Sequence, residues 1–310
     1  MTKAEIQLVR ALADKRGRAE HGLFIAEGEK LIGELRASHL RVRRIFALEG
    51  LFEGPETETV SPRDMERISQ LKTPSNSLAL VEIPRHRLDA EHLGNRLTLA
   101  LDEVQNPGNL GTIIRLADWF GIGDIVCSEG SADCFNPKVV QATMGAILRV
   151  RIHYAPLTPL LAGAAARGVA VYGTFLDGED IYSADLTPGG IIVMGNEGRG
   201  VTDAVARTVT RRLFIPPYPA GREGSESLNV ASHCRHGDGH RLLGVPPASA
   251  QLTARRTGHA TRTSECGGAG RPASPHFFRA IRRANCLHIL NILYFCKLKH
   301  TRLCRNTDSR

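Results

Sequence analysis

The sequence predicts an α/β protein in which a small N-terminal α/β domain precedes a larger domain built on a parallel sheet. Two observations lead to this fold class. Short apolar runs alternate with segments of helical period through the first 230 residues, and glycine-rich loops follow several of these runs. Strands that are apolar on both faces and alternate with helices are typical of a parallel sheet that helices cover on both sides.

The N-terminal domain is assigned to residues 1–95. Apolar residues recur at helical spacing over residues 3–15, which predicts a helix there, and the basic residues 15–18 follow as a turn. A second helix is predicted over residues 28–37. Three short apolar runs predict strands, over residues 23–26, 42–47 and 78–83. The polar residues 82–89 then form a linker.

The second domain is assigned to residues 96–231, where strand and helix signals alternate. Five apolar runs predict strands, over residues 97–102, 124–127, 169–175, 190–194 and 212–216. Four segments of helical period predict helices, over residues 109–120, 137–147, 159–167 and 202–209. Pro137 is well placed at the first position of one of them, because its fixed backbone angle suits a helix start. This alternation predicts parallel strands.

The net charge of +8 belongs to the C-terminal part of the chain. Of the 40 Lys and Arg residues, 14 lie in residues 232–310, together with only 3 of the 32 Asp and Glu residues. The first 231 residues therefore hold 26 basic and 29 acidic residues and are nearly neutral. His233, Cys234, His236 and His240 cluster in the basic part, but without a CxxC pair or a common zinc spacing. We predict no metal site there.

No apolar run reaches the roughly 18 residues that a membrane-spanning helix needs, and the first residues lack the apolar stretch of a signal peptide. The sequence therefore predicts a cytoplasmic protein that does not act at a membrane. Cys127 and Cys134 are interpreted as ordinary reduced thiols, because they have no nearby partner pair.

Three glycine-containing motifs stand out, each directly after a predicted strand. The first covers residues 106–115 (NPGNLGTIIR) and the second residues 192–200 (IVMGNEGRG). The third covers residues 215–218 (IPPY) and continues at residues 225–230 (SESLNV). Ligands of parallel sheets bind beyond the carboxyl ends of the strands, so we expect the three motifs to lie side by side.

The first motif lets the backbone approach a ligand closely and opens a helix, where free N–H groups favour anions. A plain turn with an asparagine cap is an equally common explanation. Arg115 lies six residues beyond Asn109, about one and a half helical turns. Because it follows the apolar pair Ile113 and Ile114, we expect it to be partly buried and aimed at the strand ends. An ordinary solvated arginine is the alternative.

The other two motifs also leave alternatives open. Glu197 and Arg199 stand among three glycines directly after an apolar strand, but GxGxxG spacing and a Walker lysine are both missing. Ser225 or Ser227 fits the N-cap of a helix. A hydrolase with Ser227 as nucleophile is a further possibility, although the chain has no GxSxG elbow.

In this order, the three motifs resemble those of the SpoU (TrmH) family of RNA ribose 2′-O-methyltransferases, in the SPOUT superfamily. The resemblance covers residues 97–230, and residues 24–28 and 68–71 also resemble the N-terminal substrate-binding domain of the family. It implies a parallel-sheet catalytic domain with a trefoil knot, preceded by an α/β RNA-binding domain. It also implies S-adenosyl-L-methionine as cofactor, rRNA or tRNA as substrate, and a homodimer.

The resemblance further implies roles for single residues. Arg115 would orient or help to deprotonate the ribose 2′-hydroxyl. The remaining polar site would be formed by Asn109, Glu197, Ser227 and Asn229. The S-adenosylmethionine pocket would be lined, largely by backbone groups, by Thr174, Leu176, Gly195, Ile215 and Leu228. Methyl transfer to an oxygen needs alignment and help with one proton, which such a set supplies.

The resemblance ends at Ala231. In the family, the third motif leads into a long helix rich in alanine and valine, which completes the knot and much of the dimer contact. Residues 231–240 (ASHCRHGDGH) instead contain two interior glycines and no apolar stripe. We interpret residues 232–310 as an anomalous basic tail, largely disordered and produced by a frameshift, although a basic RNA-binding arm is an alternative. If the helix is lost, a catalytically impaired RNA-binding protein is the alternative function.

Overall fold

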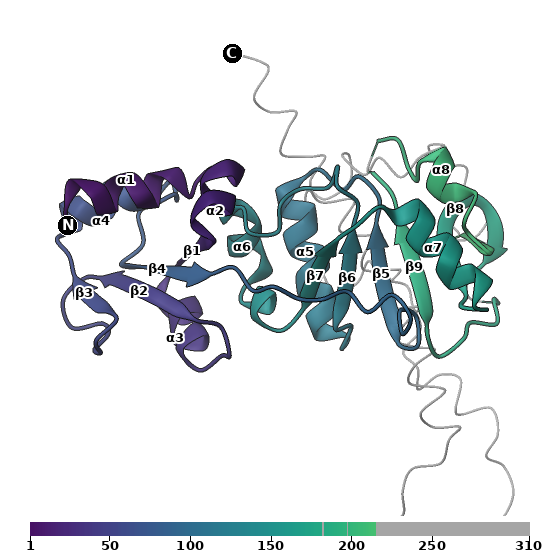
Figure 1. Ribbon diagram of the computed structural model, residues 1–310, viewed down its shortest axis with the longest axis horizontal. Helices are drawn as coiled ribbons and strands as arrows, with labels where there is room; N and C mark the ends of the chain where they lie inside the picture. The colour runs from purple at the N-terminus through teal and green to yellow at the C-terminus, as the bar shows by residue number, and fades with distance from the viewer. Residues whose placement is uncertain (182, 197, 215–310) are drawn as a thin grey trace, which may run out of the picture.

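The computed structural model describes residues 1–181, 183–196 and 198–214, which form two β-sheets with their helices (Figure 1). The first sheet has four strands and comes from the N-terminal part of the chain. The second has six strands, and every paired neighbour in it is parallel. The predicted α/β fold class with a parallel sheet is confirmed.

The four-stranded sheet has the order β1-β4-β2-β3, with β1 and β2 antiparallel to the central β4. Its strands are β1 (Leu23–Glu27), β2 (Val42–Ala47), β3 (Thr57–Thr59) and β4 (Ser77–Glu82). Its helices are α1 (Lys3–Ala11), α2 (Lys15–His21), α3 (Glu29–Arg36) and α4 (Pro62–Ile68). Successive side chains of a strand point to opposite faces. Leu23 and Ile25 of β1 therefore pack in the core with α1 and α4, whereas Phe24 and Ala26 join a second core on the other face.

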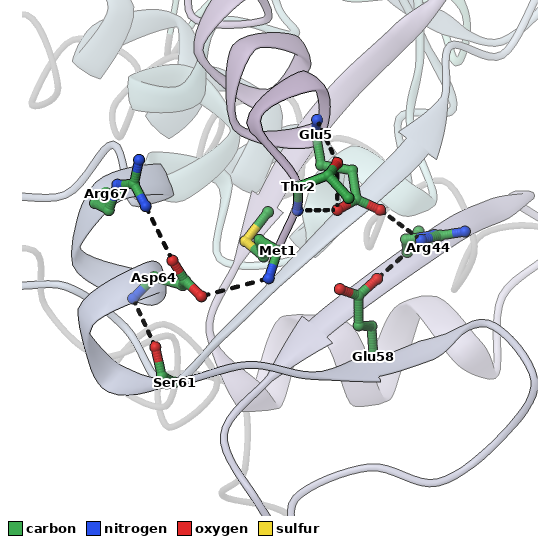
Figure 2. A network of polar contacts seen from close by, with 8 residues as sticks. All are labelled: Met1, Thr2, Glu5, Arg44, Glu58, Ser61, Asp64 and Arg67. Atoms are coloured by element: carbon green, nitrogen blue, oxygen red, sulfur yellow. Dashed lines mark hydrogen bonds and ion pairs between the residues drawn. The ribbon is translucent and has the colours of Figure 1, made fainter.

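A network of polar contacts fixes the start of α1 (Figure 2). The Thr2 hydroxyl accepts from the backbone N–H of Glu5, and the Thr2 backbone N–H donates to the Glu5 carboxylate at 2.7 Å, a reciprocal capping box. Arg44 on β2 bridges Glu5 and Glu58, at 2.8 Å from each. The amino terminus lies 3.4 Å from Asp64 of α4. The network thus joins α1 to the sheet and to α4.

The six-stranded sheet has the order β10-β8-β9-β5-β6-β7. Its strands are β5 (Leu97–Leu101), β6 (Asp124–Cys127), β7 (Arg151–Tyr154), β8 (Val171–Asp180), β9 (Gly190–Met194) and β10 (Arg211–Phe214). Helices α5 (Pro107–Trp119) and α6 (Pro137–Thr143) and the short 3-10 helix Ala146–Leu148 cover one face. Helices α7 (Leu157–Ala166) and α8 (Asp203–Ala206) cover the other. The inner strands β5, β6 and β9 therefore need apolar residues on both sides, which explains their continuous apolar runs.

Several local predictions were wrong. Residues 15–18 begin α2 instead of forming a basic turn, because Arg18 turns inward and is only 2% exposed. Strands β3 and β7 and helix α4 were not predicted. Strand β3 is only three residues long, and β7 (RIHY) is mostly polar, so neither strand shows an apolar run in the sequence. Strand β8 continues five residues beyond the predicted end at residue 175.

Cys127 and Cys134 are both buried and free. Burial raises the pKa of Cys127 far above its usual range and the pKa of Cys134 to about 12. Both side chains are therefore protonated and unreactive at neutral pH. In the part of the chain that the structure describes, none of the helices has the length and hydropathy that crossing a bilayer requires.

Candidate functional site at the carboxyl edge of the parallel sheet

Three loops meet where the central strands of the parallel sheet end. They follow β5 (residues 102–106), β6 (residues 128–136) and β9 (residues 195–202), and they contain the first motif's start and the second motif. Neighbouring pairs of these strands are in register at their last residues: Leu101 pairs with Cys127 on one side and with Met194 on the other. The parallel arrangement thus brings together segments almost 100 residues apart in sequence.

Glu103 joins the three loops. Its backbone N–H donates to the Ser128 hydroxyl at 2.8 Å, and its carbonyl accepts from the side-chain amide of Asn196 at 2.9 Å. Its carboxylate accepts from the Arg199 guanidinium at 2.6 Å. Glu103 also has a positive φ of 54°, a conformation that a non-glycine residue rarely adopts. Such strain is kept where surrounding contacts hold it, as here.

Asp102 ties the second motif to the end of β5. Its carboxylate is almost fully buried and accepts from the Thr202 backbone N–H at 2.7 Å, while its own N–H donates to the Met194 carbonyl at 2.8 Å. Thr202 is the N-cap residue of α8. Neither Asp102 nor Glu103 was predicted as a site residue. The available signal was a pair of acidic residues at the end of an apolar strand, a position comparable to that of the charged pair Glu197 and Arg199 after β9.

The first motif opens α5, as predicted. The side-chain oxygen of Asn106 accepts from the backbone N–H groups of Gly108 and Asn109, at 2.8 and 3.2 Å, and Pro107 occupies the first turn. Asn109 is buried, with 4% of its surface exposed, at the helix end nearest to the three loops. A Cβ atom on Gly111 would lie 2.4 Å from the Ala142 side chain, so this glycine permits close packing of α5 and α6.

Arg115 is exposed, contrary to the expectation that it is partly buried. The apolar pair before it faces the core, and each residue of an α-helix is rotated by about 100° from the one before it. Arg115 therefore lies on the outer face of α5. Trp119, one turn further, shares that face and is 82% exposed.

The second motif forms a closed loop at the end of β9. Reciprocal backbone hydrogen bonds of 2.8 and 2.9 Å join Asn196 and Gly200, and the Asn196 side chain accepts from the N–H groups of Gly198 and Arg199. A Cβ atom on Gly195 would lie 2.1 Å from the carbonyl carbon of Gly200. Only glycine fits at residue 195 without opening the loop. The predicted part of Gly195 in cofactor binding stays a prediction.

Thr174 and Leu176 lie where β8 departs from its partner. Arg212 of β10 pairs with Gly173, but the next residue, Leu213, pairs with Glu179, so residues 174–178 form an irregular excursion. Leu176 is 72% exposed there. Arg212 stacks over the Phe175 ring at 3.5 Å from its centroid, and its hydrogen bond to Asp177 holds the pKa of that carboxyl below its usual range. The contacts of Arg212 with Phe175 and Asp177 therefore fix residues 174–178, while the Leu176 side chain between them is exposed to solvent.

Five predicted site residues lie outside the described part of the chain: Glu197, Ile215, Ser227, Leu228 and Asn229. The segment that would form the knot lies outside it as well. Of the other five, Asn109 and Gly195 belong to the joined first and second motifs. Arg115 lies further along α5, and Thr174 and Leu176 lie on the neighbouring β8. Their roles stay predictions.

Comparison with known proteins agrees with this arrangement. The family described as "SpoU rRNA Methylase family" matches residues 96–234, and the "MRM3-like substrate binding domain" matches residues 3–79. The 23S rRNA (guanosine(2553)-2′-O)-methyltransferase RlmP of Bacillus subtilis is 31% identical over 227 residues, which are 71% of this chain and 88% of that protein. A rRNA 2′-O-methyltransferase of Streptomyces viridochromogenes, named for uridine 2479 of 23S rRNA, is 28% identical over 54% of this chain and 60% of its own.

Two solved structures share both fold and sequence with the chain. A putative RNA methyltransferase of the TrmH family from Porphyromonas gingivalis is 38% identical, with a TM-score of 0.65, over 70% of this chain and 89% of its own. An AdoMet-bound rRNA methyltransferase from Sinorhizobium meliloti is 28% identical, with a TM-score of 0.63, over 73% of this chain and 89% of its own.

Proposed function

Because the chain belongs to the SpoU rRNA methylase family, we propose that it is an S-adenosylmethionine-dependent methyltransferase that acts on a ribose 2′-hydroxyl of rRNA or tRNA. The observation that carries the proposal is that Glu103, in the loop leading into the first motif, binds Asn196 and Arg199 of the second motif at the carboxyl edge of the parallel sheet. Ligand sites of parallel sheets lie at this edge. The proposed reaction is that of the relatives, which are named as rRNA 2′-O-methyltransferases.

The described residues have the chemical groups that binding of S-adenosylmethionine requires. The closed loop at Gly195 presents backbone groups, and the exposed Leu176 offers an apolar surface for a ring. We propose that Thr174, Leu176 and Gly195 contact it together with Ile215 and Leu228. When bound, S-adenosylmethionine supplies a methyl group on a sulfonium that is already activated toward a nucleophile.

The chain's own contribution is alignment of the ribose oxygen and help with its proton. We propose that Arg115, which is exposed on α5, holds the nucleotide by binding a phosphate or the hydroxyl with its guanidinium. Arginine keeps its proton in proteins, so Arg115 positions the nucleophile and does not act as its base. Asn109, Glu197, Ser227 and Asn229 are proposed to complete the polar surroundings of that oxygen.

The domain organisation and assembly are also proposals. Residues 1–95 would bind the RNA and residues 96–231 would carry the reaction. We propose a homodimer, as the family resemblance implies, with the exposed apolar side chains of Trp119 and Met144, at the ends of α5 and α6, as candidate interface residues. The cytoplasm is the proposed location, since rRNA and tRNA are the proposed substrates.

The reaction can be tested directly with isotopically labelled S-adenosylmethionine and 23S rRNA transcribed in vitro. We expect label in the RNA and resistance to alkaline cleavage at the methylated nucleotide, because a methylated 2′-oxygen cannot attack the neighbouring phosphate. A labelled base with an unmodified ribose would contradict the assignment. Heat-treated protein gives the background.

We further propose that the reading frame changes near codon 231. The charge balance changes sharply there, and the family match ends at residue 234. If residues 232–240 (SHCRHGDGH) are encoded by GC-rich codons, reading those codons one base over can give a sequence such as AIAATAMA, which suits an apolar helix. A protein that lacks this helix would expose apolar surface of the catalytic domain and dissolve poorly. RNA binding without methyl transfer is the second candidate function, and the same sequence change favours it.

Restoring the frame is expected to raise soluble yield and methyl transfer together. The gene is sequenced around codon 231, and the parent and restored proteins are compared under identical expression and assay conditions. A variant that simply stops after codon 231 is the control, because it removes the basic tail without supplying the helix. Immediate stop codons in the alternative frame would contradict the proposal and favour the basic RNA-binding arm.

A further inference from the structure

The two sheets share one continuous apolar core. Phe24 and Ala26 of β1 pack in the same cluster as Val139 and Val140 of α6, and the Phe24 and Phe135 rings lie 4.8 Å apart between centroids. Figure 1 shows α2 and β1 next to α6 at this junction. The chain between the sheets, residues 83–96, contains no helix or strand. The packed junction, and not the linker, therefore sets how the two domains are oriented.

An ion pair between buried Arg18 and partly buried Asp133 crosses the junction. Arg18 of α2 is 2% exposed, and its Nε and Nη2 atoms donate to one carboxylate oxygen of Asp133 at 3.0 and 2.6 Å. Its Nη1 donates to the carbonyls of Leu12 and Ala13, at 2.8 Å each. A second pair across the junction, Glu34 with Arg149, is half-exposed and shared with another carboxylate, so water and salt screen it.

Asp133 lies in a loop that also contacts the candidate site. One residue before it, the Ala132 backbone N–H donates to the Val104 carbonyl at 2.9 Å, and Ser128 of the same loop accepts from the Glu103 backbone N–H. Glu103 in turn holds the second motif. The loop of residues 128–136 therefore contacts the N-terminal domain through Asp133, and through Ser128 and Ala132 it contacts residues 103–104, which lead into the first motif.

We infer that Arg18 and Asp133 are positioning residues, which fix the RNA-binding domain at a set orientation to the methyl-transfer site and so govern where the RNA enters that site. The inference rests on the proposed function. Domains joined by a linker move relative to one another unless a large apolar interface restrains them, and misplacement of a substrate by about 1 Å can cost 10²-fold in rate. A directional, buried pair adds orientation to the apolar contact.

The substitution Asp133→Asn is designed to remove the contact with Arg18 without disturbing the local fold. The remaining side-chain oxygen can still accept from the Phe135 backbone N–H, which Asp133 now does at 2.9 Å, so the local turn is preserved. The new NH₂ group then faces the guanidinium of Arg18. Both groups are hydrogen-bond donors, so the two hydrogen bonds from Arg18 are lost. Glu58→Gln is the matched control, because it also neutralises a carboxylate that pairs with an arginine, but within the N-terminal domain (Figure 2).

The test combines hydrogen exchange of the free protein with methyl-transfer kinetics on 23S rRNA transcribed in vitro. For Asp133→Asn we expect faster exchange in both β1 and α6, a KM for RNA about tenfold higher, and an unchanged affinity for S-adenosylmethionine. Glu58→Gln should change none of these. Arg18→Lys, which keeps the charge but loses the forked geometry, should fall between the parent and Asp133→Asn.

Two outcomes would overturn the inference. Faster exchange confined to residues 128–136 would mean that the pair stabilises only its own loop. An unchanged KM despite faster exchange across the junction would mean that domain orientation does not govern RNA entry. A parent protein that transfers no methyl group would instead count against the proposed function, and the exchange experiment would still decide whether the pair holds the domains together.

Discussion

Replacing Arg115 with alanine is expected to lower the rate of methyl transfer by about 10²-fold or more, the usual effect of removing a positioning or acid–base group. Affinity for S-adenosylmethionine should change little, because Arg115 is proposed to contact the RNA and not the cofactor. The side chain is exposed, so its loss should leave the fold unchanged.

The measurement compares single-turnover rates on RNA with cofactor binding by calorimetry. Arg207→Ala is the matched control, since Arg207 is also an exposed arginine at a helix of this domain, but α8 covers the opposite face of the sheet. Arg115→Lys should recover only part of the rate, because a lysine lacks the planar fork that binds a phosphate. Equal rates for Arg115→Ala and the parent would show that Arg115 is an ordinary solvated side chain.

Gly195→Ala is expected to abolish cofactor binding and methyl transfer together, with a rate at least about 10²-fold lower. The added Cβ would lie 2.1 to 2.2 Å from backbone atoms of Gly200 and Val201, so the closed loop must open. Opening breaks the pairing of Asn196 with Gly200 and draws the Asn196 side chain away from the Glu103 carbonyl. The first and second motifs then lose their connection.

Gly198→Ala is the control within the same loop. Its added Cβ would meet nothing closer than the Asn196 side-chain oxygen at 3.6 Å, so the loop can stay closed. Calorimetry measures cofactor affinity, and thermal unfolding checks that both variants remain folded. Normal affinity in Gly195→Ala would show that the loop after β9 does not hold the cofactor.

The sequence predicted the parallel sheet well, because a strand buried on both faces is apolar along its whole length. The runs at residues 97–102 and 190–194 match β5 (Leu97–Leu101) and β9 (Gly190–Met194) almost to the residue. It did not predict β7 (Arg151–Tyr154), an edge strand with polar side chains. The one buried residue of β7 is His153, so the strand shows neither a continuous apolar run nor an alternation of apolar and polar residues.

The position of the candidate site in the fold was predicted from the sequence, but the side-chain contacts that build it were not. That the first two motifs meet follows from parallel pairing, which a sequence can suggest. Glu103 and Arg18 make contacts with residues 96 and 115 positions away in sequence, and no local pattern marks such pairs. The burial of Arg115 was predicted from its apolar neighbours, yet those neighbours face the core and thereby turn Arg115 outward.

The shared apolar core limits how this protein can be recombined with its relatives. Residues 83–96 are an obvious place to join the N-terminal domain of one protein to the catalytic domain of another. Such a chimaera would inherit β1 from one parent and α6 from the other, and the Phe24–Phe135 contact would depend on both. A working exchange must therefore transfer residues 128–143 together with the N-terminal domain, so the exchangeable module is discontinuous in the gene.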